Sequence, residues 1–114
     1  MLTIKEHHYF GYFDGLVYGH RKYSEPLDAY RGIRNTIARD AVLQHIENLS
    51  PWLAPITGSR ADIIDGEEFK YVGPGRYEDG DFVFPTEFPH YYEKYNLGIP
   101  PEYEAYLKSI GVGQ

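Results

Sequence analysis

The chain has 114 residues, of which 42% are hydrophobic and 25% charged, and its formal net charge at pH 7 is −6. These proportions are typical of a globular protein, and we expect residues 1–114 to form one domain. The absence of cysteine excludes disulfides and thiolate metal sites and suits the cytoplasm. No apolar run is long enough to cross a membrane, and the first residues lack the apolar core of a signal peptide.

The charge is unevenly distributed along the chain. Residues 1–60 carry seven basic and six acidic side chains, a net charge of +1, whereas residues 61–114 carry four basic and eleven acidic ones, a net charge of −7. An acidic half repels phosphate backbones, which argues against direct nucleic-acid binding. It attracts a basic protein surface instead.

Residues 2–23 have the pattern of a β-hairpin. The Asp14-Gly15 dipeptide is typical of a two-residue type I′ turn. That turn places Tyr9 opposite His20, with His7 diagonal to His20 on the same face, about 7–8 Å away. The two histidines could begin an acid–base or ligand site, or they could simply face solvent. No third residue has the spacing of a metal ligand, so we expect no metal site.

The segment 24–49 is the only long one with helical periodicity. Ser24 is a candidate N-cap and Pro26 falls in the first turn. Apolar side chains then recur three or four residues apart, as on one buried helical face, so we predict the main α-helix over about 25–49. Gly32 would cost about 1 kcal/mol inside this helix. Arg34 lies at the edge of the apolar stripe, where its stem could cover the core or its guanidinium could hold a carboxylate or phosphate.

Residues 61–84 predict short strands joined by tight turns. The turns are signalled by Asp65-Gly66, Gly73-Pro74-Gly75 and Asp79-Gly80. The glycine spacing matches neither a phosphate-binding loop nor a dinucleotide-binding loop, and the acids at 79 and 81 do not complete a calcium loop. We therefore expect no cofactor.

Residues 85–101 contain four prolines, which argue against periodic structure, so we predict an ordered, extended strap, with at most one turn at His90–Tyr95. Its aromatic side chains could pack onto the sheet or form an interface, and both interpretations stay open. After Pro100-Pro101, apolar residues at i, i+3, i+4 and i+7 predict a short helix over about 101–110.

Taken together, these elements predict an α+β fold. An antiparallel sheet, formed by the N-terminal hairpin and the short central strands, packs against the main helix, with a short C-terminal helix beside it. The order of elements does not fit parallel βαβ units, which need strands alternating with helices.

Three functional interpretations follow. The first is a non-catalytic, tyrosine-rich module that covers a basic surface of a nuclease or another nucleic-acid enzyme. It could be an inhibitor of the immunity or anti-defence type found in phages and mobile elements, a comparison of strategy only. The residues expected to contact the partner combine carboxylates with aromatic rings: Asp79, Asp81, Glu87, Tyr91, Tyr92 and Glu93.

The second interpretation is a small enzyme or ligand-binding domain in which His7, Tyr9 and His20 line a pocket. Its electrostatic partner would be Arg34 or Asp14. The sequence offers no recognisable nucleophile for such an enzyme, so a non-catalytic role is favoured over this one. The third is a structural subunit of a larger assembly, with aromatic surfaces covered by neighbours or by self-association into a homo-oligomer.

Overall fold

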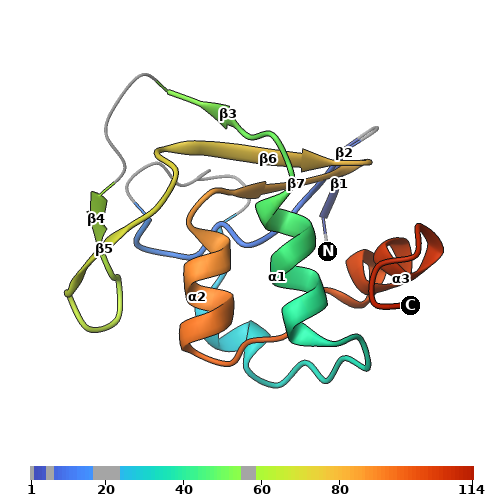
Figure 1. Cartoon of the computed structure of the whole chain (residues 1–114). Coiled ribbons are helices and arrows are strands. Elements are labelled where there is room, and N and C mark those ends of the chain that lie inside the picture. Colours follow the sequence, from blue (N-terminus) through green and yellow to red (C-terminus); the bar gives the residue numbers. More distant parts are fainter. Residues whose placement is uncertain (1, 5–6, 17–23, 55–58) are drawn as a thin grey trace.

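The computed structural model describes residues 2–4, 7–16, 24–54 and 59–114, and within them it has the expected α+β architecture (Figure 1). Five strands form one sheet in the order β1-β2-β7-β6-β3, and two more pair separately as β4-β5. The strands are β1 (Leu2–Ile4), β2 (His7–Tyr9), β3 (Trp52–Leu53), β4 (Ser59–Ala61), β5 (Glu68–Lys70), β6 (Gly75–Asp79) and β7 (Phe82–Pro85). The helices are the 3₁₀ turn η2 (Leu27–Tyr30) and the α-helices α1 (Arg39–Glu47), α2 (Phe88–Lys94) and α3 (Pro101–Ser109).

The large sheet is mixed, because one pair of neighbouring strands is parallel. β6 and β7 form the expected antiparallel hairpin, and Gly80 turns between them at a φ of 61°. β2 instead runs parallel to β7, with His8 opposite Phe82. The long connection between these two strands leaves their relative direction free, since only a tight turn forces antiparallel pairing.

The N-terminal strands do not pair as the hairpin predicted over 2–23, because the two strands that pair with each other, β1 and β2, both precede the Asp14-Gly15 turn. The turn at Asp14-Gly15 is present, and Leu16 N–H donates to the carbonyl oxygen of Phe13 at 3.2 Å. However, β1 pairs with β2 so that His7 lies opposite Ile4. Phe13 pairs with Glu25 instead of with a strand following the turn. The expected partners in 17–23, including His20, lie outside the described residues.

The main helix is much shorter than the predicted span of about 25–49. After the 3₁₀ turn η2 the chain is irregular, and α1 begins only at Arg39. The N–H groups of Thr36 and Ile37 donate to the Glu104 carboxylate at 2.6 and 3.0 Å instead of joining a helical ladder. Hydrogen bonds to a carboxylate of α3 therefore replace the helical hydrogen bonds that the local apolar spacing predicted, because tertiary contacts can outweigh helix propensity.

The strap expected over 85–101 contains the helix α2 over Phe88–Lys94, which is more than the one turn allowed at His90–Tyr95, so the prediction of extended structure is wrong for its centre. α2 tolerates Pro89 because proline lies in its first turn, where the missing N–H has no partner to lose. Its aromatic residues Phe88, Tyr91 and Tyr92 then fall on one face and are buried. The helical period thus brings the rings of this segment into the core.

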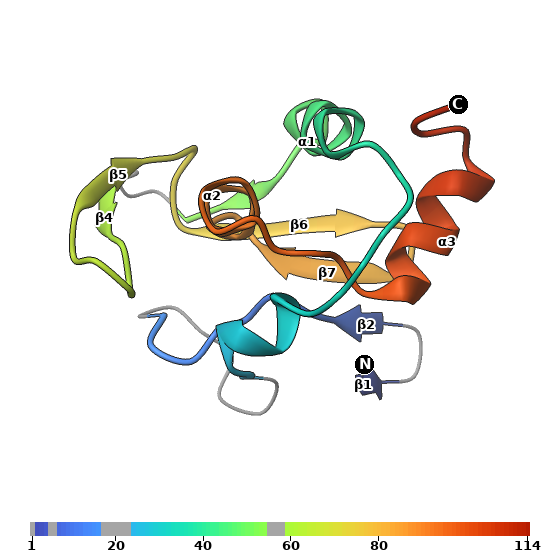
Figure 2. The ribbon, with the colours of Figure 1, turned by 90° about the horizontal axis from the view of Figure 1, so that it is seen from below.

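The core is largely aromatic. Phe10 packs against Phe84 with ring centroids 4.9 Å apart and edge-on against Phe88 at 5.3 Å. Tyr103 of α3 closes the same cluster at 5.0 Å from Phe10. Aromatic pairs of this kind stabilise a core beyond the area they bury. Seen from below, the β4–β5 hairpin and α3 lie at opposite ends of the molecule, with α1 and α2 between them (Figure 2).

Candidate functional site

The six residues expected to contact a partner do not share one exposed patch. Asp81 and Glu93 are exposed. The other four are buried, with at most 6% of each residue exposed: Asp79, Glu87, Tyr91 and Tyr92. The aromatic part of the expected surface is therefore interior, and of the acidic part only those two carboxylates are available to a partner.

Asp79 organises a buried polar cluster at the end of β6. Its Oδ2 is hydrogen bonded to His45 Nε2 at 2.8 Å and accepts the hydroxyl of Tyr103 at 2.7 Å, while Oδ1 accepts the hydroxyl of Tyr106 at 3.2 Å. Burial and the nearby carboxylate raise the pKa of Tyr103 far above its ordinary value. The cluster ties α1 and α3 to the sheet, because the three donors come from those two helices.

The buried aromatic residues and Glu87 also have structural contacts. The Tyr91 hydroxyl accepts Ile63 N–H at 3.0 Å, and the Arg39 guanidinium lies 4.1 Å from the centre of the Tyr92 ring. Glu87 lies 3.7 Å from Arg60, and its burial raises the pKa of its carboxyl.

The residues of the ligand-binding alternative are not all described. His7 and Tyr9 lie in β2, and both edges of β2 are paired, with β1 and with β7, so the expected pairing of these residues across a hairpin is wrong. His20 itself lies outside the described residues. Tyr9 is half-buried and packs edge-on against Tyr12, with centroids 6.2 Å apart. Arg34 is exposed in the irregular segment before α1.

A groove of about 380 Å³ opens between α1, α2 and the chain leaving β5. Its apolar walls include Leu43 of α1, Pro89 of α2 and Val72, which is 53% exposed. The helices lie side by side (Figure 1), so Glu47 at the end of α1 and Glu93 on α2 both line the groove. The site thus combines apolar contact area with carboxylates from two elements.

The other titratable groups of the groove are Lys70, Tyr71, Tyr77 and His90. Lys70 is exposed at the end of β5. Burial raises the pKa of Tyr77, the nearby Glu47 carboxylate adding to the effect. The two glutamates outnumber the single lysine, so the lining favours a cationic ligand.

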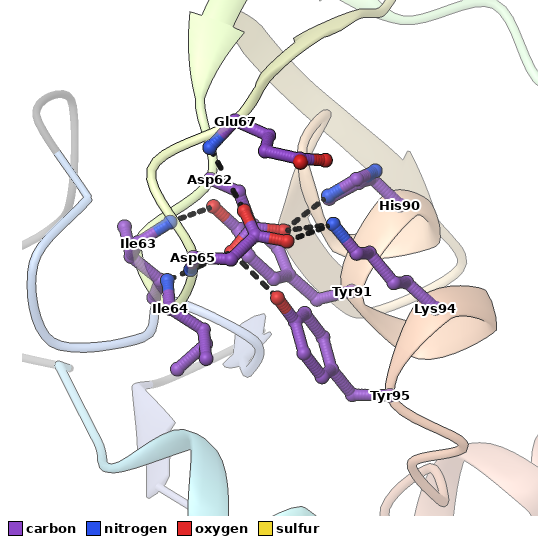
Figure 3. A network of polar contacts seen from close by, with 9 residues as sticks. All are labelled: Asp62, Ile63, Ile64, Asp65, Glu67, His90, Tyr91, Lys94 and Tyr95. Carbon is purple, nitrogen blue, oxygen red and sulfur yellow. Dashed lines mark hydrogen bonds and ion pairs between the residues drawn. The ribbon is translucent and has the colours of Figure 1, made fainter.

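His90 connects the groove to a polar network beneath the β4–β5 hairpin (Figure 3). Its ring stacks on Phe69 with centroids 3.6 Å apart and planes within 2°. Its Nε2 is hydrogen bonded at 2.7 Å to Asp62 Oδ2, and the Asp62 side chain is fully buried. The position of His90 is therefore fixed by both a ring and a carboxylate.

Asp62 accepts three further hydrogen bonds through Oδ1. The donors are Ile64 N–H at 2.7 Å, Asp65 N–H at 3.2 Å and the Tyr95 hydroxyl at 2.8 Å. Burial alone would raise the pKa of Asp62, but the hydrogen bonds, led by the one from His90, hold it well below its ordinary value.

Lys94 completes the network from the next turn of α2. It is paired with Asp65 and lies 3.4 Å from Asp62. The hydrogen bond from Lys94 lowers the pKa of Asp65. The network therefore fastens the β4–β5 hairpin to α2 and holds in place the wall of the groove that follows β5.

Sequence reasoning missed Asp62, Glu47 and His90 as members of a site. A signal existed in the spacing of His90 and Lys94, which are four residues apart and share a face once 88–94 is a helix. The prolines of this segment argued against a helix, so the spacing was not interpreted as a shared helical face.

Comparison with protein-family models, with curated proteins and with solved structures finds no match to this chain. Within the described ranges, no helix is both long and apolar enough to traverse a lipid bilayer. Nor do three or more His, Asp or Glu side chains of the described residues come together as metal ligands.

Proposed function

We propose that the protein is a small acidic, non-catalytic protein-binding module that takes a basic segment of a partner protein into the groove between α1, α2 and the chain after β5. The observation that carries the proposal is the pair of carboxylates, Glu47 and Glu93, that line the groove from two helices beside apolar side chains. A partner bound there would meet both a charge and an apolar wall.

An arginine side chain fits this combination best. Its planar guanidinium can reach two carboxylates at once, while its aliphatic stem packs on apolar residues such as Val72 and Pro89. A lysine would provide one compact charge and fewer donors. Lys70 repels the cation from one side, so the partner's basic group should sit toward the two glutamates.

The net charge of −6 means that the whole molecule, and not only the groove, attracts a cationic partner. Long-range attraction speeds the encounter with a basic surface, and desolvated contacts slow release. Basic surfaces are typical of nucleases and other nucleic-acid enzymes. The role we propose is therefore that of an inhibitor of the immunity or anti-defence type. Such an inhibitor would be carried by a phage or mobile element and would act in the cytoplasm. The burial of Tyr91 and Tyr92 moves the expected contact away from those rings and onto the groove.

The test uses a short synthetic peptide in which arginine alternates with leucine, with a glutamine-for-arginine version as control. We expect the double variant Glu47→Gln/Glu93→Gln to bind the arginine peptide about 10–100-fold more weakly, from roughly 1–3 kcal/mol of lost charge-assisted contact. The affinity of the wild type should also fall as salt is added.

A matched control is the double variant Glu78→Gln/Glu102→Gln, which removes the same charge elsewhere. Glu78 is exposed on β6 and alternates with the groove residue Tyr77, and Glu102 is exposed on α3. Calorimetry should find near wild-type affinity for this control. Equal weakening by both double variants, or equal binding of the two peptides, would remove the groove from the proposal.

A further inference from the structure

A second pocket, of about 290 Å³, lies at the other ends of the same two helices, before α1 and after α2. We propose that this pocket binds a small anion, the phosphate or carboxylate group of a ligand, independently of the groove. The side chains that would hold it are Arg34 and Asn96, with Arg39 adding positive charge from the wall.

The walls of the pocket are held by hydrogen bonds between distant segments. Gly98 N–H donates to the carbonyl oxygen of Tyr30 at 2.9 Å. Asn35 exchanges two hydrogen bonds with the backbone of Ile99, at 2.8 and 3.1 Å. A Cβ at position 98 would come within 2.6 Å of Ile33, so only glycine allows the two chains to lie this close. The pocket is thus preformed, as ligand sites usually are.

Arg39 is a fixed cation in this wall. Its Nη1 donates to Leu97 O at 2.6 Å and its Nη2 donates to Tyr92 O, while the guanidinium stacks on the Tyr92 ring. These bonds use two of its five N–H donors and hold the guanidinium against the carbonyls of Tyr92 and Leu97. Arg39 therefore adds positive charge to the pocket from a fixed position.

Arg34 is the flexible cation of the pocket. Its one hydrogen bond given by the structure is a long one, from Nη1 to Arg31 O at 3.3 Å, and the residue is exposed. A guanidinium has five N–H donors in a fixed fork that matches a phosphate or carboxylate. The exposed Asn96, held at a φ of 53° after α2, adds an amide beside it.

Among the described residues, no aspartate or glutamate lines this pocket. Two acidic groups lie beside it, Asp40 next to Arg39 and Glu104 against Asn35, and both already accept backbone N–H groups. Asp40 accepts Ala41 N–H at 2.9 Å. Burial raises the pKa of Glu104, but hydrogen bonds from Ile37 N–H, Asn35 and Thr36 N–H outweigh it and bring that pKa to about 2. The remaining lining is apolar at Ile33, Ile37 and Leu97, which suits an anion attached to a small organic group.

The experiment is an NMR titration of the full chain with inorganic phosphate and, separately, with sodium acetate, each against sodium chloride at matched ionic strength. We expect saturable amide shifts in residues 33–39 and 96–98 with at least one of the two anions. Saturation by phosphate identifies a phosphate site and saturation by acetate a carboxylate site. Absence of saturable shifts with both anions would overturn the proposal.

Two arginine variants distinguish binding of the anion in this pocket from non-specific electrostatic attraction. Arg34→Ala should weaken the binding at least tenfold, whereas Arg31→Ala, which removes the same charge from a residue paired with Asp28, should leave it within about twofold. Equal weakening by the two variants would show that the shifts report the overall charge, and would also overturn the proposal. Because neither variant touches the groove, the result is independent of peptide binding.

Discussion

Replacing Asp62 with alanine should destabilise the protein more than any other single change of an acidic side chain in the β4–β5 hairpin. The Asp62 side chain is fully buried and accepts four hydrogen bonds, from His90, the Tyr95 hydroxyl and two backbone N–H groups. Leaving buried donors without a partner costs about 1–3 kcal/mol each, and the sum is reduced by relaxation and water entry. We therefore expect a loss of about 3–5 kcal/mol, the range measured when one partner of a buried ion pair is removed.

Urea unfolding followed by far-UV circular dichroism measures this loss. The matched control is Asp65→Ala in the same turn, where the carboxylate is about one-third exposed and pairs with Lys94. An exposed ion pair of this kind contributes little to stability, so Asp65→Ala should unfold close to wild type. Hydrogen exchange of residues 59–70 shows whether the hairpin opens alone or with the whole domain.

Two results together would contradict this prediction. The free energies of unfolding of the two alanine variants would lie within about 1 kcal/mol of wild type, and hydrogen exchange of the hairpin would be unchanged. The pH dependence gives a second check. The pKa of Asp62 is lowered in the folded state. Its contribution is therefore present above the ordinary aspartate pKa of about 3.9 and is lost as the pH falls below it. The stability of wild type should decrease more steeply below about pH 4 than that of Asp62→Ala.

Three further substitutions test the packing. Gly98→Ala should lower the free energy of unfolding in urea by about 1–3 kcal/mol, because the new Cβ has no room beside Ile33. The Cβ added by Gly32→Ala points into open space, so this variant should be neutral or stabilised by up to about 1 kcal/mol. Equal effects of the two variants would contradict the close approach of residues 98 and 33. Glu104→Gln should remove stability that wild type keeps above about pH 4 and loses toward its folded pKa of about 2, so acid titrations that superimpose would contradict this linkage. Tyr103→Phe should cost about 1–2 kcal/mol by removing the hydroxyl from buried Asp79, and thermal melts identical to wild type would contradict it.

The sequence predicted those elements whose signals are local. The C-terminal helix was expected over 101–110 and is found at Pro101–Ser109, because its proline start and its apolar spacing lie within the segment itself. The β6–β7 hairpin likewise follows from the Asp79-Gly80 turn between two short strands. Both elements depend on contacts between residues that are near in sequence.

The elements that differed from expectation depend on distant residues. The main helix begins late, at Arg39, because Glu104, far along the chain, accepts the N–H groups of Thr36 and Ile37. Tyr91 and Tyr92 of α2 are interior, as in the interpretation that these rings pack onto the sheet, but the helix that buries them was not predicted from the proline-rich segment. The groove is a product of the same packing, since Glu47 and Glu93 approach each other only when α1 and α2 do.

The most direct measurement of the proposed function is a map of amide shift changes when the arginine peptide is added to the isotopically labelled chain. The account predicts that the changes centre on residues 43–47, 70–72 and 89–93, which line the groove. Changes centred instead on the exposed edge strand β3, with Trp52 and Leu53, would contradict it.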